Sequence, residues 1–158
     1  MKRYLLTPLL VFACLVSCAQ SLTFEDLLNL TNMSGTQVHD FLTVSKGFKS
    51  SGPQVVGGKS TELYKSTRTT QDKAESVLLG GLAKGAGGNL SRPVTYSIMQ
   101  EADINNLLTQ AKKSSLTLVF QGSDLNKNIF RFDNSLFRAS ISISFDKKSG
   151  TVEVQQKD

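Results

Sequence analysis

His39 is the only histidine in the 158-residue chain, and it stands beside Asp40 in a stretch with helical spacing. A catalytic histidine needs a nucleophile or another partner within hydrogen-bond reach, and the sequence nominates none. Serines are abundant, but the G-x-S-x-G turn that exposes a hydrolase nucleophile does not occur. We therefore expect His39 to be a partly buried structural residue and predict no catalytic residue. A hydrolase whose site is assembled from residues distant in sequence remains an alternative.

Acidic side chains are scattered along the chain, so none forms a spare pair for acid–base catalysis. They fit helix starts and turns instead: Glu25, Asp26, Glu101 and Asp103 at helix starts, Asp133 and Asp146 at turns. Both cysteines, Cys14 and Cys18, lie at the N-terminus. With so few thiols and one imidazole, a His/Cys metal site and a disulfide framework are excluded from the folded domain. We predict no metal and no cofactor.

The stretch GPQVVGGKST at residues 52–61 has some features of a phosphate-binding P-loop. Such a loop needs G-x-x-x-x-G-K-[ST], because its amides surround the phosphates while the lysine reaches them. Pro53 stands where the first glycine belongs, and Gly52 gives one residue too many. We interpret residues 49–61 as a solvated turn or loop and predict no nucleotide partner.

Glycines recur through residues 80–88 and include a G-x-x-x-G at Gly81 and Gly85. In a long apolar helix this spacing favours packing within a membrane, but Lys84 interrupts it and the apolar stretch is too short. A glycine in a helix interior costs about 1 kcal/mol relative to alanine. We expect a short helix at 72–79 that runs into a flexible loop, and a partner-binding or membrane-contacting loop is the alternative.

The N-terminus has the three-part layout of a secretory signal. Lys2 and Arg3 precede an apolar stretch from Leu5 to Val16, and small residues follow at Ser17 and Ala19. The apolar stretch is too short for a permanent membrane span. The pattern therefore predicts export of the chain and removal of the signal.

The end of this signal allows two outcomes. Residues 15–18 spell LVSC, which resembles the lipobox of bacterial lipoproteins, a class in which the cysteine becomes the lipidated first residue. The resemblance implies a lipid anchor on Cys18 and a periplasm-facing position in the bacterial cell envelope. The alternative is an ordinary cut after Ala19, which would give a soluble periplasmic or secreted protein.

The charge balance argues against a nucleic-acid partner. Loss of residues 1–17 takes Lys2 and Arg3 from the 18 basic residues and leaves all 13 acidic ones, so the formal charge falls from +5 to +3. A charge this small, without a basic cluster, is not the footprint of a nucleic-acid binder. At 39% hydrophobic and 20% charged residues, the chain is too apolar to be disordered, and its length suits one domain.

Capping-box spacings mark two helix starts, Thr23 with Asp26 and Ser34 with Gln37. We expect a first helix after Thr23 and a second over 35–46 that ends at Gly47. The clearest helical pattern covers 101–113, where acidic residues occupy the first turn and lysines the last, as the helix dipole favours.

Period-2 alternation predicts strands through the rest of the chain, most clearly at 136–145, where one face is apolar and the other polar. The turn at 146–150 is expected to place Gly150 at a positive φ. The expected class is α+β, a two-layer antiparallel β-meander with helices packed on one face. The predicted strands are 62–68, 93–98, 116–120, 128–133, 136–145 and a last strand containing Val152 and Val154.

The expected organisation is a signal peptide (1–17), a lipidated cysteine with a short tether (18–23) and a single α+β domain (24–158). We expect a non-enzymatic protein-binding module, accessory or inhibitor-like, at the cell envelope. Its candidate contact residues are Arg131 and Arg138, beside and on the polar side of the 136–145 strand, and Lys84 in the glycine-rich loop. The alternative is a soluble domain that holds a small ligand or lipid between its helices and its sheet.

Overall fold

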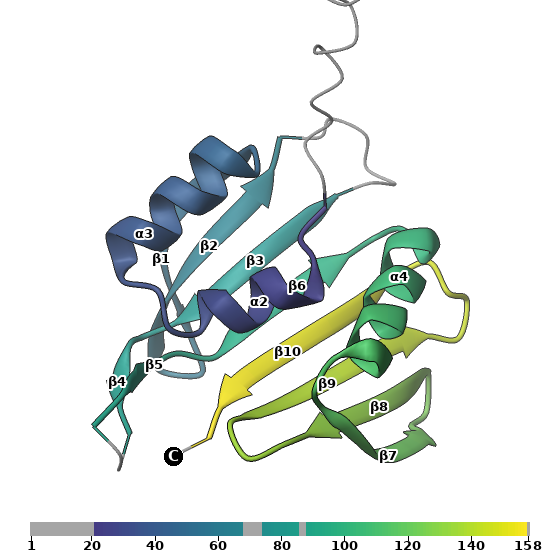
Figure 1. Cartoon of the computed structure of the whole chain (residues 1–158). Helices are drawn as coiled ribbons and strands as arrows, with labels where there is room; N and C mark the ends of the chain where they lie inside the picture. The colour runs from purple at the N-terminus through teal and green to yellow at the C-terminus, as the bar shows by residue number, and fades with distance from the viewer. Residues whose placement is uncertain (1–20, 68–73, 86–87, 158) are drawn as a thin grey trace, which may run out of the picture.

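The computed structural model describes residues 21–67, 74–85 and 88–157, and eight strands in this part of the chain form one antiparallel sheet. Their order across the sheet is β1 (Phe48–Val56), β2 (Lys59–Ser66), β3 (Glu75–Gly80), β6 (Val94–Ile98), β10 (Gly150–Gln156), β9 (Phe137–Ser144), β8 (Lys127–Asp133) and β7 (Thr117–Ser123). The chain thus builds the sheet from one edge to the centre, crosses to the far edge, and returns to the centre (Figure 1).

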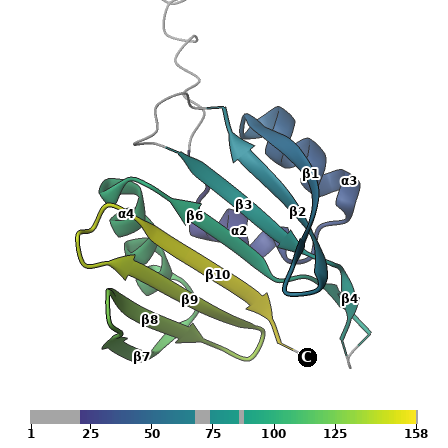
Figure 2. The same ribbon diagram turned by 180° about the vertical axis from the view of Figure 1, so that it is seen from behind.

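The described helices cover one face of this sheet, and the view from behind shows the strands bare (Figures 1 and 2). Helix α2 (Phe24–Leu30) and helix α3 (Gly35–Asp40) each begin at the capping box that the sequence predicts. Helix α3 continues as a wider π-helical turn, η2 (Phe41–Ser45). Helix α4 (Glu101–Lys113) has the predicted bounds and connects the two halves of the sheet.

The core lies between the helices and the sheet. Alternate residues of the central strands, such as Val94, Tyr96 and Val152, are buried on the helix-covered face. Leu27 of α2 and Leu107 of α4 are buried against them in the same core cluster. The α+β class, the antiparallel C-terminal meander and the one-sided helix layer are therefore confirmed. The signal, Cys18 and all of the tether before residue 21 lie outside the described residues.

The loop expected at 49–61 is wrong, because these residues form most of the β1–β2 hairpin. Gly57 and Gly58 make its two-residue turn, and both have positive φ (58° and 77°). Glycine reaches this conformation without steric cost, and such turns match the twist of paired strands. The glycines, serines and proline that indicated a loop instead mark a turn and an edge-strand bulge between Ser50 and Pro53.

The short helix expected at 72–79 is also wrong. Its described part belongs to β3, where Glu75, Val77 and Leu79 are buried with strand periodicity. Strands β2 and β6 flank β3 on its two sides, so tertiary pairing overrides the helical spacing of the apolar residues. The glycine-rich segment that follows contributes a separate two-stranded ribbon, β4 (Ala83–Lys84) with β5 (Leu90–Ser91).

The β9–β10 turn differs from expectation in one residue. Lys147, not Gly150, has the positive φ (57°). Gly150 is buried at the start of β10, where helix α4 packs against the sheet. None of the described helices is long and apolar enough to cross a membrane.

Candidate functional site

Arg131 and Arg138, two of the predicted contact residues, lie on the face of the sheet that the helices leave open. Their strands pair so that Arg131 is opposite Ser140 and Arg138 is opposite Asp133. The intervening residues, such as buried Phe132, point toward the helices. Because strand side chains alternate between faces, both exposed arginines share the other face. The structure therefore brings this predicted pair together.

Lys84 does not join them. It is exposed on the β4–β5 ribbon, which lies beyond the β1–β3 side of the molecule, whereas β8 and β9 lie on the opposite side (Figure 1). Cys18, the predicted lipidation site, lies outside the described residues. The candidate contact residues thus fall on two separate surfaces, and only the arginines belong to the sheet.

Hydroxyl side chains run across the middle of this open face. Ser76, Ser97, Thr151 and Ser142 are register partners on four adjacent strands and are half-buried by their neighbours. Lys65 continues the row on β2. Short side chains of this kind leave a hollow of about 430 Å³, lined in part by Lys65, Ser76, Ser97 and Thr151, and supply both hydrogen-bond donors and acceptors.

The open face carries more positive than negative side chains. Of its acidic residues, Glu153 is exposed and Asp133 is paired with Lys157 near the C-terminus. The Lys157 ammonium, with help from Arg138, holds the pKa of the Asp133 carboxyl below its ordinary value. The basic residues that register and alternation place on this face are Lys49, Lys59, Lys65, Lys127, Arg131 and Arg138.

An aromatic side chain borders the arginines. The guanidinium carbon of Arg131 lies 5.2 Å from the ring centroid of Phe120 on β7, a cation–π distance. The same ring lies over Gly122, where an added Cβ would meet it at 2.7 Å. The contact holds one arginine beside an apolar surface at the edge of the open face.

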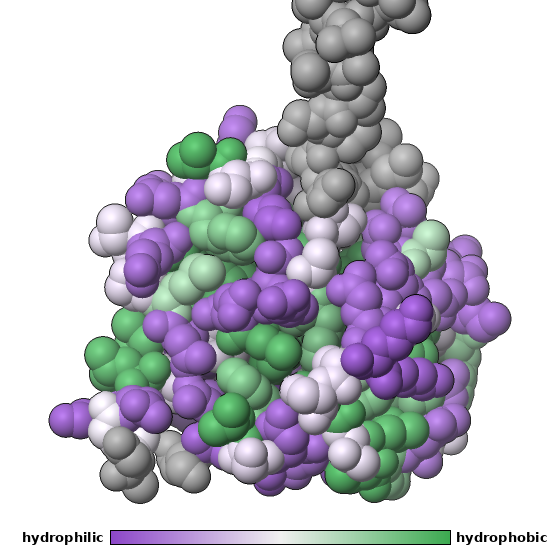
Figure 3. Space-filling view, viewed as in Figure 1, coloured by the Kyte–Doolittle hydropathy of each residue, from purple (hydrophilic) through white to green (hydrophobic). Residues whose placement is uncertain are grey.

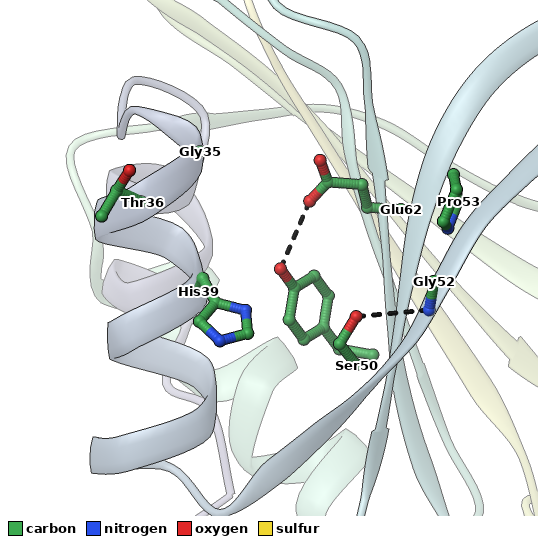
Figure 4. A pocket seen from close by; sticks show the side chains of 8 residues that line it. Gly35, Thr36, His39, Ser50, Gly52, Pro53 and Glu62 are labelled. Atoms are coloured by element: carbon green, nitrogen blue, oxygen red, sulfur yellow. Dashed lines mark hydrogen bonds between the residues drawn. The ribbon is translucent and has the colours of Figure 1, made fainter.

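A second candidate surface is a hollow of about 470 Å³ between α3 and the β1–β2 hairpin (Figure 4). The Tyr64 hydroxyl donates to Glu62 Oε2 at 3.2 Å, and the Gly52 amide donates to Ser50 Oγ at 3.2 Å. The His39 ring meets Tyr64 edge-on, with centroids 6.2 Å apart. The residues that line the hollow are Gly35, Thr36, His39, Ser50, Gly52, Pro53, Glu62 and Tyr64.

His39 is exposed in this hollow, so the expectation of a partly buried histidine is wrong. It points from α3 toward Tyr64 (Figure 4), and the neighbouring Val38 fills the core position instead. Because the sequence predicted a loop at 49–61, it did not predict the β1–β2 hairpin that forms the opposite wall of the hollow. The glycine pair at 57–58, which follows the β-branched Val55 and Val56, is the signal that could have revealed it.

The electrostatics of the hollow keep the Tyr64 phenol protonated. Burial, followed by the Glu62 carboxylate, raises the pKa of Tyr64, so its phenol stays neutral and donates. Burial lowers the pKa of the neighbouring Arg92, and Glu62 partly offsets that effect. Arg92 Nη2 donates to the Met33 carbonyl at 3.1 Å, which ties the guanidinium to the segment before α3. The Tyr64 phenol can therefore donate a hydrogen bond within the hollow.

A buried acidic cluster beside α4 is absent from the sequence-based expectations. The Tyr96 hydroxyl donates to Glu75 Oε2 at 2.5 Å, and the Ser21 hydroxyl lies 3.2 Å from both Glu75 and Asp103. Ser21 opens the described chain, so the cluster fixes the start of the domain to the sheet and to α4. A single glutamate among alternating apolar residues is its only sequence signal.

In the described ranges no three His, Cys, Asp or Glu side chains gather in a way that could hold a metal ion. Comparisons with protein-family models, with curated proteins and with solved structures find no match. The open face of the sheet and the hollow between α3 and the β1–β2 hairpin are therefore the two candidate binding surfaces.

Proposed function

We propose that this chain is a non-enzymatic protein-binding module of the bacterial cell envelope, exported and lipid-anchored at Cys18, which binds an acidic partner protein through the open face of its sheet. The observation that supports this most is the excess of basic residues on a sheet face that no described helix covers. Complementary charge steers partners together and sets which partner is accepted.

The open face has the dimensions of a protein interface. Eight strands spaced about 4.8 Å apart span on the order of 34 Å, and seven-residue strands such as β8 and β10 are about 23 Å long. These dimensions approach the ~800 Å² per partner that specific protein complexes bury. The row of hydroxyls supplies polar contacts, and Phe120 beside Arg131 offers the aromatic–arginine pairing common at interface hot spots.

Site-specific photo-cross-linking in the source bacterium tests the proposal. A benzophenone amino acid at Ser140, on the open face, is expected to capture an acidic protein, whereas the same probe at Asn106 on α4 is not. Charge reversal at Arg131→Glu/Arg138→Glu is expected to reduce this product at least tenfold. The matched control is Lys112→Glu/Lys148→Glu, one exposed lysine on helix α4 and one in the β9–β10 turn, whose reversal changes the net charge equally.

The variant Lys84→Glu distinguishes binding through the β4–β5 ribbon from binding through the open face of the sheet, because Lys84 lies on the ribbon. An undiminished product in this variant supports binding through the open face. A product that survives reversal of both arginines, or that appears equally from Asn106, would contradict it.

Anchoring is tested by the intact mass of the mature protein from a membrane fraction. A diacyl or triacyl adduct on Cys18 is expected, together with its loss in Cys18→Ala. An N-terminus at Gln20 without lipid would replace the anchored form with a soluble one.

The hollow between α3 and the hairpin favours a second candidate function, a domain that binds a small polar ligand. Its Glu62, Ser50 and His39 side chains offer mixed donors and acceptors, which suit a hydroxyl-rich ligand better than a lipid. Titration with N-acetylglucosamine, followed by the amide resonances of Gly52 and His39, tests this function. Saturable shifts that disappear in Glu62→Gln would support it, and unchanged spectra at millimolar sugar would oppose it.

A further inference from the structure

Strand β7 forms one edge of the eight-stranded sheet, with β8 on its inner side. None of its seven residues, TLVFQGS, is charged. Leu118, Val119 and Phe120 are consecutive and are 39%, 60% and 45% exposed. Hydrophobic side chains also gather below α4 in the space-filling view, where β7 lies in Figure 1 (Figure 3). An exposed, apolar, uncharged edge strand offers its free backbone groups to another strand.

The opposite edge shows how this fold protects a strand. Strand β1 carries Pro53, a register shift between Ser50 and Pro53, and an exposed lysine, Lys49. Proline removes an amide donor, a bulge twists the edge and a charge resists apolar contact. Strand β7 has a register shift near Val119 but neither proline nor charge. The two edges therefore differ in their readiness to pair.

Charges at the two ends of β7 indicate what pairs with it. Lys112 and Lys113 end α4 just before the strand, Asp124 follows it directly, and all three are exposed. In an antiparallel pair of identical strands, the start of one strand lies beside the end of the other. Lys113 of each copy would then approach Asp124 of its partner, whereas a parallel pair would place like charges together.

We infer that β7 pairs with β7 of a second copy of this chain, antiparallel about a two-fold axis near Phe120, which continues the sheet across the dimer. Each copy supplies the apolar side chains that cover those of the other, as a self-complementary two-fold interface requires. One seven-residue strand is a small contact, so a reversible, concentration-dependent dimer is expected. The inference is independent of the partner proposed for the open face.

Analytical ultracentrifugation of the mature protein as exported, in one buffer for all variants, tests this pairing. Dimer content is expected to rise with concentration, and Val119→Lys is expected to weaken dimerisation at least tenfold. The matched control is Val55→Lys on β1, a similarly exposed valine at the other edge. Circular dichroism checks that both variants fold. A monomer at every concentration, or equal loss of the dimer in both variants, would overturn the inference.

Charge exchange tests the orientation. Lys113→Glu and Asp124→Lys are each expected to weaken the dimer, and the double variant is expected to restore it. A pairing centred at Phe120 also places Thr117 opposite Ser123 of the partner, so Thr117→Cys/Ser123→Cys should form disulfide-linked dimers that neither single variant forms. Cross-linking of Thr117→Cys alone would indicate parallel strands and contradict the two-fold antiparallel pair.

Discussion

Gly150 of β10 lies so close to Ile104 of α4 that a Cβ atom at position 150 would meet three side-chain carbons of Ile104 at 2.9 Å. Both residues are buried. The missing side chain of Gly150 therefore allows α4 to pack closely on a central strand. Because α4 also connects the two halves of the sheet, this contact helps to fix how those halves join.

Gly150→Ala is expected to lower the free energy of unfolding by about 1–3 kcal/mol, because the added methyl group overpacks the helix–sheet contact. Gly35→Ala is the matched control, since nothing lies within 4 Å of a Cβ there and the residue begins α3. That change should leave stability unaltered or slightly raised. Urea denaturation followed by circular dichroism measures both, and equal effects would contradict the packing argument.

Tyr96→Phe is expected to destabilise the domain by about 1–3 kcal/mol, because Glu75 is 4% exposed and would lose the phenol that donates to it. Tyr64→Phe provides the comparison. Its partner Glu62 is exposed and can hydrogen-bond to water instead, so the cost should be clearly smaller. The same urea denaturation separates the two. A larger loss in Tyr64→Phe would be inconsistent with a structural role for the buried pair.

The raised pKa values of Tyr64 and Tyr96 predict that the folded protein loses stability at alkaline pH. Burial, reinforced by Glu75 for Tyr96 and by Glu62 for Tyr64, raises both pKa values above the ordinary 10.0. A group whose pKa is raised by folding contributes its full stability below the unfolded pKa, and this contribution is lost as the pH rises above it. The urea midpoint should therefore fall above about pH 10, with a smaller fall in Tyr96→Phe. Full tyrosinate absorbance of the folded protein near pH 10 would contradict these shifts.

Local signals correctly predicted the starts of α2 and α3 and the bounds of α4, because helix ends depend on residues a few positions apart, but they also predicted a helix at 72–79, where β3 lies. The capping boxes at Thr23 and Ser34 and the bounds of α4 appear as expected. Strand β1 was missed because its glycines, serines and proline indicated a loop, and β3 was missed because its pairing with β2 and β6 overrides the helical spacing of its apolar residues. Gly80 illustrates the reason: its missing side chain accommodates Pro93, whose carbons would lie 2.5 Å from a Cβ, yet in sequence it suggested a loop.

The candidate sites divide in the same way. Alternation along β9 correctly placed Arg138 away from the core, and the register with β8 added Arg131 to the same face. The hollow could not be predicted, since Ser50 and Glu62 face His39 only after β1 and β2 pair beside α3. Sites built on one strand can be inferred from periodicity, whereas sites built between elements need the topology.

The ion pair between Asp133 and Lys157 is expected to stabilise the folded protein at neutral pH and to lose this effect in acid. The hydrogen bond from Lys157 outweighs the opposing effect of burial and, with the charges of Lys157 and Arg138, lowers the pKa of Asp133 from its ordinary 3.8. A carboxyl whose pKa is lowered by folding stabilises the protein above the unfolded value, and the contribution is lost as the pH falls through the folded value. Asp133→Asn should therefore lower the melting temperature near pH 7, and its effect should shrink as the pH falls further below 3.8.

A double-mutant cycle with Lys157→Met isolates this pair. The two substitutions are expected to be coupled near pH 7, because either one removes the ion pair that joins the end of β8 to the C-terminal segment. The coupling should vanish in acid, where Asp133 is protonated in both states. Melting temperatures of the four proteins at the two pH values measure it. Coupling of the same size at both would show that packing, and not the charge on Asp133, joins the two segments.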